Sequence, residues 1–145
     1  MRVGHLARRF LTSLSPHPPS ADDEAWAERW LLLGELGLWR RMANVDRRHA
    51  VVVARRFVDR RPAAERAEVA GALLHDVGKV ESSLGTVGRV VATVVGPRTA
   101  PFRTYHDHEA LGAGLAEIAG SDPVTVALIR GQGPAAADLT WADDV

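Results

Sequence analysis

The sequence contains no cysteine, and its 145 residues include only one lysine, Lys79, against seventeen arginines. Without cysteine there can be no disulfide scaffold, no thiolate zinc site and no cysteine nucleophile. Any transition-metal site must therefore be built from histidine, aspartate and glutamate side chains. The six histidines are accordingly the first residues to consider.

The sequence also lacks a net charge and a long apolar run. Its formal net charge is zero, which argues against a broad nucleic-acid-binding surface. No apolar run approaches the length of a membrane span, and the first fourteen residues lack the long apolar region and the cleavage site of a signal peptide. We therefore expect a cytoplasmic protein that does not associate with membranes.

What is present is typical of one soluble domain. The chain is 46% apolar and 25% charged, which suits a single domain with one core. Apolar residues recur at helical spacing, so we predict an all-α fold. The predicted helices cover residues 1–14, 21–34, 35–42, 45–61, 63–77, 86–95, 108–119, 123–131 and 135–145. Segment 86–95 is rich in β-branched residues and could also form a strand.

Local signals predict several helix ends. Ser20 is placed to cap the helix that begins at 21, and Asp107 to cap the one that begins at 108. Asp122 followed by Pro123 is a strong helix start. Gly78 is the expected C-terminal end of the helix over 63–77.

Polar residues interrupt the apolar stripes of several predicted helices. His49, Asp76 and His108 each stand where an apolar residue is expected, and Asp143 lies on one line with Leu139 in the last helix. Taken singly, each has a simpler interpretation as a hydrogen-bonded core residue, a cap or a solvated residue. A divalent metal would explain the set together with His75, because it neutralises carboxylates and uses imidazole lone pairs.

Four segments give this pattern a recognisable order. They are "RRHAVVVARRF", "LLHDVGK", "HEALGA" and "LTWADD". In this order they resemble the HD-domain superfamily of metal-dependent phosphohydrolases, over residues 45–145. The resemblance implies a compact multi-helix HD-domain bundle in one domain, 1–145. Residues 45–145 would form its metal-binding core, and residues 1–44 would supply helices that pack on it.

The resemblance also implies a set of metal ligands and a reaction. The implied ligands are His49, His75, Asp76 and Asp143. Binuclear members carry further histidines where this chain has Gly131 and Gln132, so we expect one divalent ion: Mn, Fe, Co, Ni, Zn or Mg. The ion would activate water for attack on a phosphoester, with Asp76 as ligand and as the group that orients or deprotonates the water.

Lys79 is the second residue to which a catalytic role is assigned. It follows the His-Asp pair by about one turn, and its compact charge suits a phosphate contact. An internal pair with a carboxylate such as Glu81 and an ordinary exposed lysine are the alternatives.

The substrate is expected to be a nucleotide or another small phosphorylated compound. Arg48 and Arg56 lie near the His49 face of their predicted helix and are assigned to substrate binding, as are His106 and His108. His106 has an equally good interpretation as a structural residue. Two other functions stay open. One is a degenerate HD module with a binding or structural role, for example as a homodimer. The weaker one is an HD-type oxygenase, which would require two iron ions.

Overall fold

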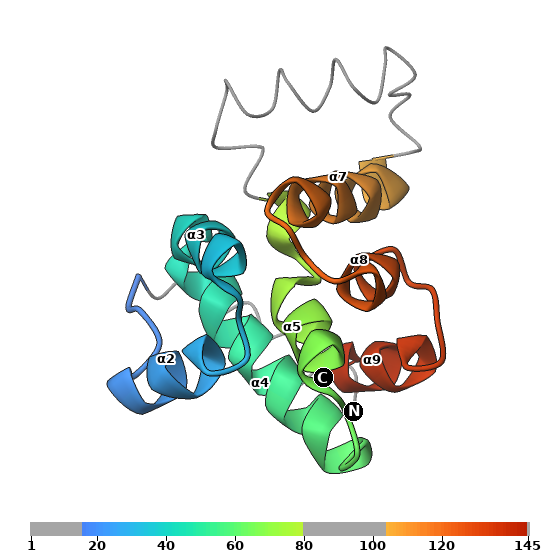
Figure 1. The fold of residues 1–145 in the computed structure, drawn as a ribbon. Coiled ribbons are helices and arrows are strands. Elements are labelled where there is room, and N and C mark those ends of the chain that lie inside the picture. Colours follow the sequence, from blue (N-terminus) through green and yellow to red (C-terminus); the bar gives the residue numbers. More distant parts are fainter. Residues whose placement is uncertain (1–15, 80–103, 145) are drawn as a thin grey trace.

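The computed structural model of this chain describes residues 16–79 and 104–144, and no β-strand occurs in these two ranges. The helices in chain order are α2 (Ala21–Glu28), α3 (Leu33–Arg41), α4 (Asn44–Arg60), α5 (Arg66–Leu74), α7 (Thr104–Ile118), α8 (Pro123–Ile129) and α9 (Ala136–Asp143) (Figure 1). The prediction of an all-α protein is therefore confirmed for the described part of the chain.

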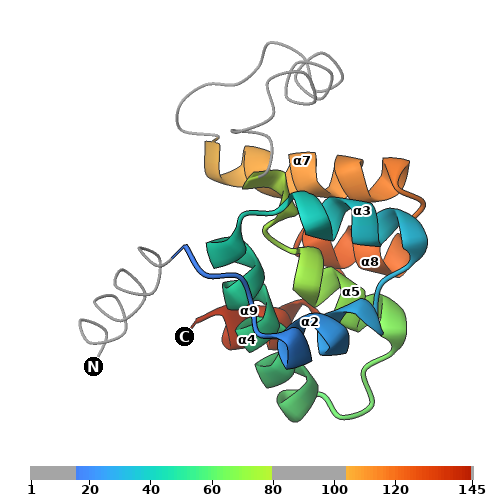
Figure 2. The ribbon, with the colours of Figure 1, turned by 90° about the vertical axis from the view of Figure 1, so that its left-hand side faces the viewer.

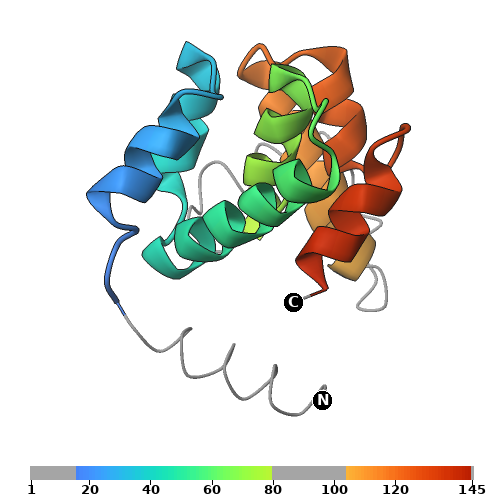
Figure 3. The same cartoon turned by 90° about the horizontal axis from the view of Figure 1, so that it is seen from below.

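Helix α5 lies at the centre of this bundle. It packs against α4 and α8 and more lightly against α3, while α9 packs on α4. Seen from below, α2 and α3 lie on one side of α4, and α8 and α9 lie on the other (Figure 3). Helix α7 lies beside α3 and α8 (Figure 2). Because α5 is covered by its neighbours, residues 67–74 are all buried, as expected of a helix that is apolar all round.

One hydrophobic cluster joins the helices. Trp39 from α3, Val53 and Phe57 from α4, and Val69 and Leu73 from α5 are fully buried members of it. The spacing of Val45, His49, Val53 and Phe57 predicts a buried stripe on this helix. Val53 and Phe57 are buried, whereas Val45 and His49 are only half-buried, so the stripe is confirmed for its second half. The cluster draws on residues before and after position 45, so α3 shares the core of the later helices.

The helices before residue 44 divide differently from the prediction. Helix α2 ends at Glu28 and α3 begins at Leu33, so Gly34 lies in the first turn of a helix rather than at the end of one. In a single helix over 21–34, Leu33 is expected to share an apolar side with Trp26 and Trp30, but Leu33 is 85% exposed. The apolar spacing is continuous through this stretch, which hides the break between the two helices.

Two later helices also have different bounds. Helix α5 covers 66–74 instead of 63–77, and a short 3₁₀ turn covers 77–79. Helix α7 begins at Thr104, so Asp107 lies inside it and the predicted cap at 107 is wrong. The helices predicted over 1–14 and 86–95 lie outside the described residues.

Two predicted caps are confirmed. The Ser20 hydroxyl oxygen accepts a hydrogen bond of 3.1 Å from the backbone N–H of Asp23 at the start of α2. The Asp122 carboxylate accepts one of 2.8 Å from the N–H of Val124 at the start of α8, where Pro123 occupies the first turn. Both satisfy backbone donors that a helix N-terminus leaves unpaired.

Two arginines, Arg56 within α4 and Arg61 directly after it, hold α9 in place. The Arg61 guanidinium pairs with Glu68 of α5 at 3.1 Å and with Asp138 of α9 at 3.2 Å. One turn earlier, Arg56 Nε donates to the Ala142 carbonyl at 3.2 Å, and its guanidinium lies 4.5 Å from the ring centroid of Trp141. The Arg61 contact fixes the first turn of α9, and the Arg56 contacts fix its last turn against α4.

A close approach of two backbones explains Gly78. A Cβ atom at this position would overlap the carbonyl oxygen of His108, and one at Gly112 would lie 3.1 Å from the backbone nitrogen of Gly78. Gly78 has no positive φ. It is therefore not the left-handed helix end that the sequence predicted, and the glycine is needed so that α7 can approach the turn after α5.

We predict that Gly78→Ala lowers the free energy of unfolding by at least about 2 kcal/mol, because a methyl group would force α7 away from the turn. Urea unfolding followed by circular dichroism measures this change. The matched control is Gly37→Ala in α3, where an added Cβ meets nothing within 4 Å. That variant should gain about 0.5–1 kcal/mol. Equal effects of the two substitutions would contradict the proposed close packing.

Candidate metal centre

Three helices bring two imidazoles and a carboxylate together. His49 lies within α4, His75 directly follows α5, and Asp143 is the last residue of α9. The Nε2 atoms of His49 and His75 lie 2.9 Å and 3.3 Å from the same Asp143 oxygen, Oδ1. One candidate ligand atom from each residue lies within 4.8 Å of the others. Their geometry makes this triad a possible metal-binding site.

The backbone fixes how His75 presents itself to this triad. Its Nδ1 lies 2.7 Å from the carbonyl oxygen of Ala72. A carbonyl oxygen only accepts hydrogen bonds, so Nδ1 is the donor. In the neutral ring Nε2 then carries a lone pair, and that lone pair faces Asp143. Two acceptors in this position are stable only when a proton or a metal ion lies between them.

The pKa values of Asp143 and His75 also indicate that a positive charge between the two side chains is favourable. Burial acts to raise the pKa of Asp143, but hydrogen bonds from His49 and His75 and their charges outweigh it and hold that pKa well below its usual range. Burial acts to lower the pKa of His75, but its hydrogen bond to Asp143 and the charges of Asp76 and Asp143 raise it above the ordinary value. Without a metal, a proton on His75 therefore stabilises the triad.

Asp76, the fourth residue predicted as a ligand, lies beside the triad rather than in it. Its Oδ2 is 3.4 Å from His75 Nε2 and 3.1 Å from the Lys79 ammonium nitrogen. Lys79 thus pairs with Asp76. The alternative pairing with Glu81 stays a prediction, because Glu81 lies outside the described residues. The ion pair leaves Lys79 40% exposed, so its ammonium reaches the pocket next to the triad.

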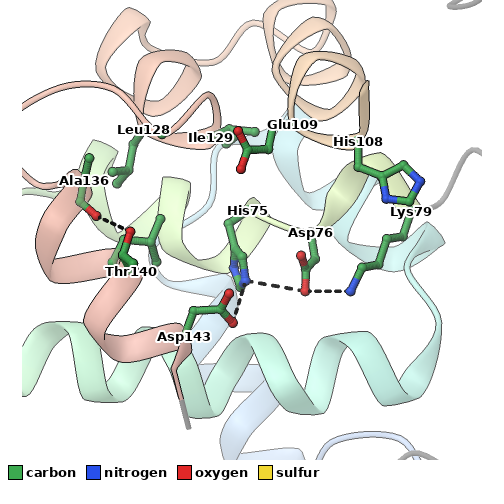
Figure 4. A pocket seen from close by; sticks show the side chains of 12 residues that line it. His75, Asp76, Lys79, His108, Glu109, Leu128, Ile129, Ala136, Thr140 and Asp143 are labelled. Atoms are coloured by element: carbon green, nitrogen blue, oxygen red, sulfur yellow. Dashed lines mark hydrogen bonds and ion pairs between the residues drawn. The ribbon is translucent and has the colours of Figure 1, made fainter. Parts of the chain in front are cut away.

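This pocket has a volume of about 340 Å³ and lies between α5, α7, α8 and α9 (Figure 4). That volume is in the range of small-molecule sites. Its polar lining residues are His75, Asp76, Lys79, His108, Glu109, Thr140 and Asp143, and its apolar ones include Leu128, Ile129, Ala136 and Leu139. Two members of the triad, a lysine and an apolar wall therefore share one cavity.

The residues predicted to bind substrate are placed in different ways. His108 lines the pocket. Arg48 bonds to the carbonyl of His17, and Arg56 bonds to that of Ala142, and neither is a lining residue. The backbone of His106 lies in α7, but its side chain is outside the described residues. Substrate binding by these residues stays a prediction.

Sequence reasoning missed two carboxylates at the site. Glu109 lines the pocket from α7. Asp46 lies one turn before His49 on α4; burial raises its pKa above the ordinary range, while the nearby charge of Lys79 opposes the shift. The three-residue spacing from His49 could have identified Asp46. Glu109 had a weaker signal, its position next to His108.

Gly131 and Gln132, which stand where the resemblance led us to expect histidines in a binuclear site, end helix α8. Gly131 has a φ of +76°, and the N–H groups of Gly131 and Gln132 donate to the carbonyls of Leu128 and Ala127. This is the Schellman arrangement at a helix C-terminus. Within residues 16–79 and 108–144, the triad is the one cluster with the geometry of a metal site.

A scan against family models, a search of curated proteins and a search of solved structures found no match to this chain. None of the described helices has the length and hydropathy that crossing a membrane requires.

We predict that the metal-free protein is most stable between about pH 4 and pH 6.5. The raised pKa of His75 gives stability that is present below its unfolded value of about 6.5 and is lost as the pH rises through the folded value. The lowered pKa of Asp143 gives stability that is present above about pH 4 and is lost on acidification. Urea unfolding in EDTA, carried out from below about pH 4 to above about pH 6.5, measures both limbs.

The variant His75→Asn tests the origin of the alkaline limb. It removes the titrating imidazole, so the decline in stability above pH 6.5 should become much smaller than in the wild type. An unchanged decline would mean that His75 is not protonated in the metal-free fold.

Proposed function

We propose that this protein is an HD-type metal-dependent phosphohydrolase that acts on a nucleotide or another small phosphorylated compound. The observation that carries the proposal is the approach of two imidazole Nε2 atoms to one oxygen of Asp143. The order of the motifs along the chain supports it, because His49, His75 and Asp143 are three of the four ligands expected from the resemblance to the HD-domain superfamily.

The residues present fit a divalent ion. Two imidazoles and one carboxylate form a three-residue set of the kind that catalytic metal sites use when they keep a position open. The bond from His75 Nδ1 to the Ala72 carbonyl is the outer contact that commonly orients a ligating histidine. Two nitrogen ligands favour a transition metal such as Fe, Zn, Co or Ni over Mg.

The chain's own residues would bind and orient the phosphate. When bound, the metal ion would supply Lewis-acid chemistry that polarises a phosphoryl oxygen and acidifies water. Lys79 would stabilise negative charge on a second phosphoryl oxygen. Asp76 holds the Lys79 ammonium at 3.1 Å and lies close enough to His75 to accept a proton at the edge of the triad.

One observation favours the second candidate, a binding or structural module. Asp76 lies outside the candidate ligand group and is paired with Lys79. A metal held by the triad alone could link α4, α5 and α9 without any turnover. Hydrolysis of phosphoesters by the metal-loaded protein separates the two functions, and loss of that hydrolysis in Asp76→Asn would assign it to this site.

We predict that purified protein binds about one equivalent of a divalent transition metal and that His75→Ala abolishes this binding. Binding to the native state adds to its stability, so the melting temperature should rise with metal in the wild type and stay unchanged in the variant. Elemental analysis and thermal denaturation after EDTA treatment and reloading measure both effects. His17→Ala, at an exposed histidine before α2, is the control and should behave as the wild type.

If Mn, Fe, Co, Ni and Zn all fail to bind and to raise the melting temperature, the metal centre is refuted. Two equivalents, both lost in His75→Ala, would instead support a binuclear centre and contradict the single ion expected from Gly131 and Gln132.

We predict that Lys79→Ala lowers turnover roughly 100-fold while metal content and melting temperature stay close to the wild type. Loss of one preorganised charge contact has about this effect on rate, whereas an exposed ion pair contributes little stability. Steady-state kinetics on the best phosphoester from a screen measures the change. Lys79→Arg should recover little, since a planar fork does not replace a compact ammonium.

Arg130→Ala removes an exposed cation next to the pocket residue Ile129 and serves as the matched control. Its turnover should equal that of the wild type. Full activity in Lys79→Ala would exclude Lys79 from the reaction, and a large loss of stability with intact activity would make it a structural partner of Asp76.

A further inference from the structure

Glu109 is the carboxylate in the pocket whose role the metal centre does not explain. The other two each face side chains of the protein, since Asp76 pairs with the Lys79 ammonium and Asp143 faces two imidazoles. Glu109 makes no hydrogen bond or ion pair with another described side chain, and its carboxylate points into the cavity (Figure 4).

A carboxylate in this position requires hydrogen-bond donors. Glu109 is partly buried, and an ionised carboxylate only accepts hydrogen bonds, through two oxygens. Removing it from water without a donor is unfavourable. A ligand that fills the cavity displaces water from Glu109. It binds well only if it supplies hydrogen-bond donors in place of that water, because otherwise the lost hydrogen bonds reduce its affinity.

The surroundings of Glu109 leave room for such a ligand. Its Oε2 lies 3.7 Å from where a Cβ atom of Gly131 would stand, so a side chain at 131 would narrow this end of the cavity. Figure 4 shows Lys79 and Asp76 on one side of Glu109 and the apolar residues Leu128 and Ile129 on the other. A phosphate near Lys79 would place the organic part of a substrate within reach of Glu109.

We infer that Glu109 is a specificity-determining residue that accepts hydrogen bonds from vicinal hydroxyl groups on the organic part of a phosphomonoester. This inference rests on the proposed function and deepens it by naming the substrate class. Two adjacent hydroxyls match the two oxygens of one carboxylate, each oxygen accepting one bond. Hydrogen bonds to a charged acceptor are strong enough to give about tenfold discrimination or more.

The experiment compares phosphomonoesters that differ in the hydroxyls only. Glycerol 3-phosphate carries a vicinal diol, and n-propyl phosphate has the same carbon chain without it. Wild-type metal-loaded protein should have a kcat/KM at least about tenfold higher for glycerol 3-phosphate. In Glu109→Ala this preference should fall to about twofold or less, with Glu109→Gln in between because its amide oxygen still accepts a bond.

Glu117→Gln is the matched control, because Glu117 lies on the same helix but is exposed near its C-terminal end. It should keep the wild-type preference. Thermal denaturation of each variant verifies that it is folded. A preference that is absent in the wild type, or unchanged in Glu109→Ala, overturns the inference. A higher kcat/KM for 3-aminopropyl phosphate than for glycerol 3-phosphate overturns it in favour of an ammonium group.

Calorimetric binding of two phosphonates separates this inference from the proposed function. 3,4-Dihydroxybutylphosphonate and butylphosphonate cannot be hydrolysed at the carbon–phosphorus bond, so they report recognition without turnover. Tighter binding of the diol that is lost in Glu109→Ala, in a protein that hydrolyses none of the esters, would refute the phosphohydrolase and retain the recognition by Glu109. Hydrolysis of the esters without any preference for the diol would support the phosphohydrolase and refute recognition by Glu109. Neither hydrolysis nor tighter binding of the diol would refute both hypotheses.

Discussion

The site depends on one electrostatic constraint: two imidazole nitrogens face the same oxygen of Asp143. Since His75 donates its other ring proton to the Ala72 carbonyl, its neutral form would place a lone pair against a carboxylate. A positive charge must lie between them, either a proton or a metal ion. The last turn of α9, the end of α5 and the second turn of α4 therefore meet at a point that is stable only when a cation is shared.

The rest of the bundle holds these three elements in register. Arg61 links α4 to both α5 and α9 through Glu68 and Asp138, and Arg56 reaches the backbone of the last turn at Ala142. These contacts leave Asp143 little freedom to move away from the imidazoles. On the opposite side, the close backbone approach at Gly78 lets α7 lie against the turn that carries Asp76. The pocket exists because both conditions are met.

Within that pocket some charged groups have a partner in the protein and one lacks it among the described residues. This difference indicates what each group does. Asp143 faces two imidazoles and Asp76 faces the Lys79 ammonium, so their main effect is to hold His75 and Lys79 in place. Lys79 is partly exposed despite its ion pair with Asp76. Glu109 lacks a partner among the described residues and faces the cavity. A ligand with a phosphate at one end and hydroxyl donors at the other would complement both.

The sequence by itself determined the helical class, the buried stripe of α4 and the caps at Ser20 and Asp122. These features depend on the spacing of neighbouring residues, which a local pattern contains. It also identified His49, His75 and Asp143 as members of one site, through the order of their motifs. The position of Asp76 beside the triad and the reason for Gly78 were decided by the tertiary structure. Both depend on how segments distant in sequence approach one another, which spacing along one helix does not encode. The pairing of Lys79 with Asp76, by contrast, joins residues only three positions apart. Glu109 belongs with the features that the tertiary structure decided, because a carboxylate next to a histidine becomes a pocket group only when α7 is packed beside α8.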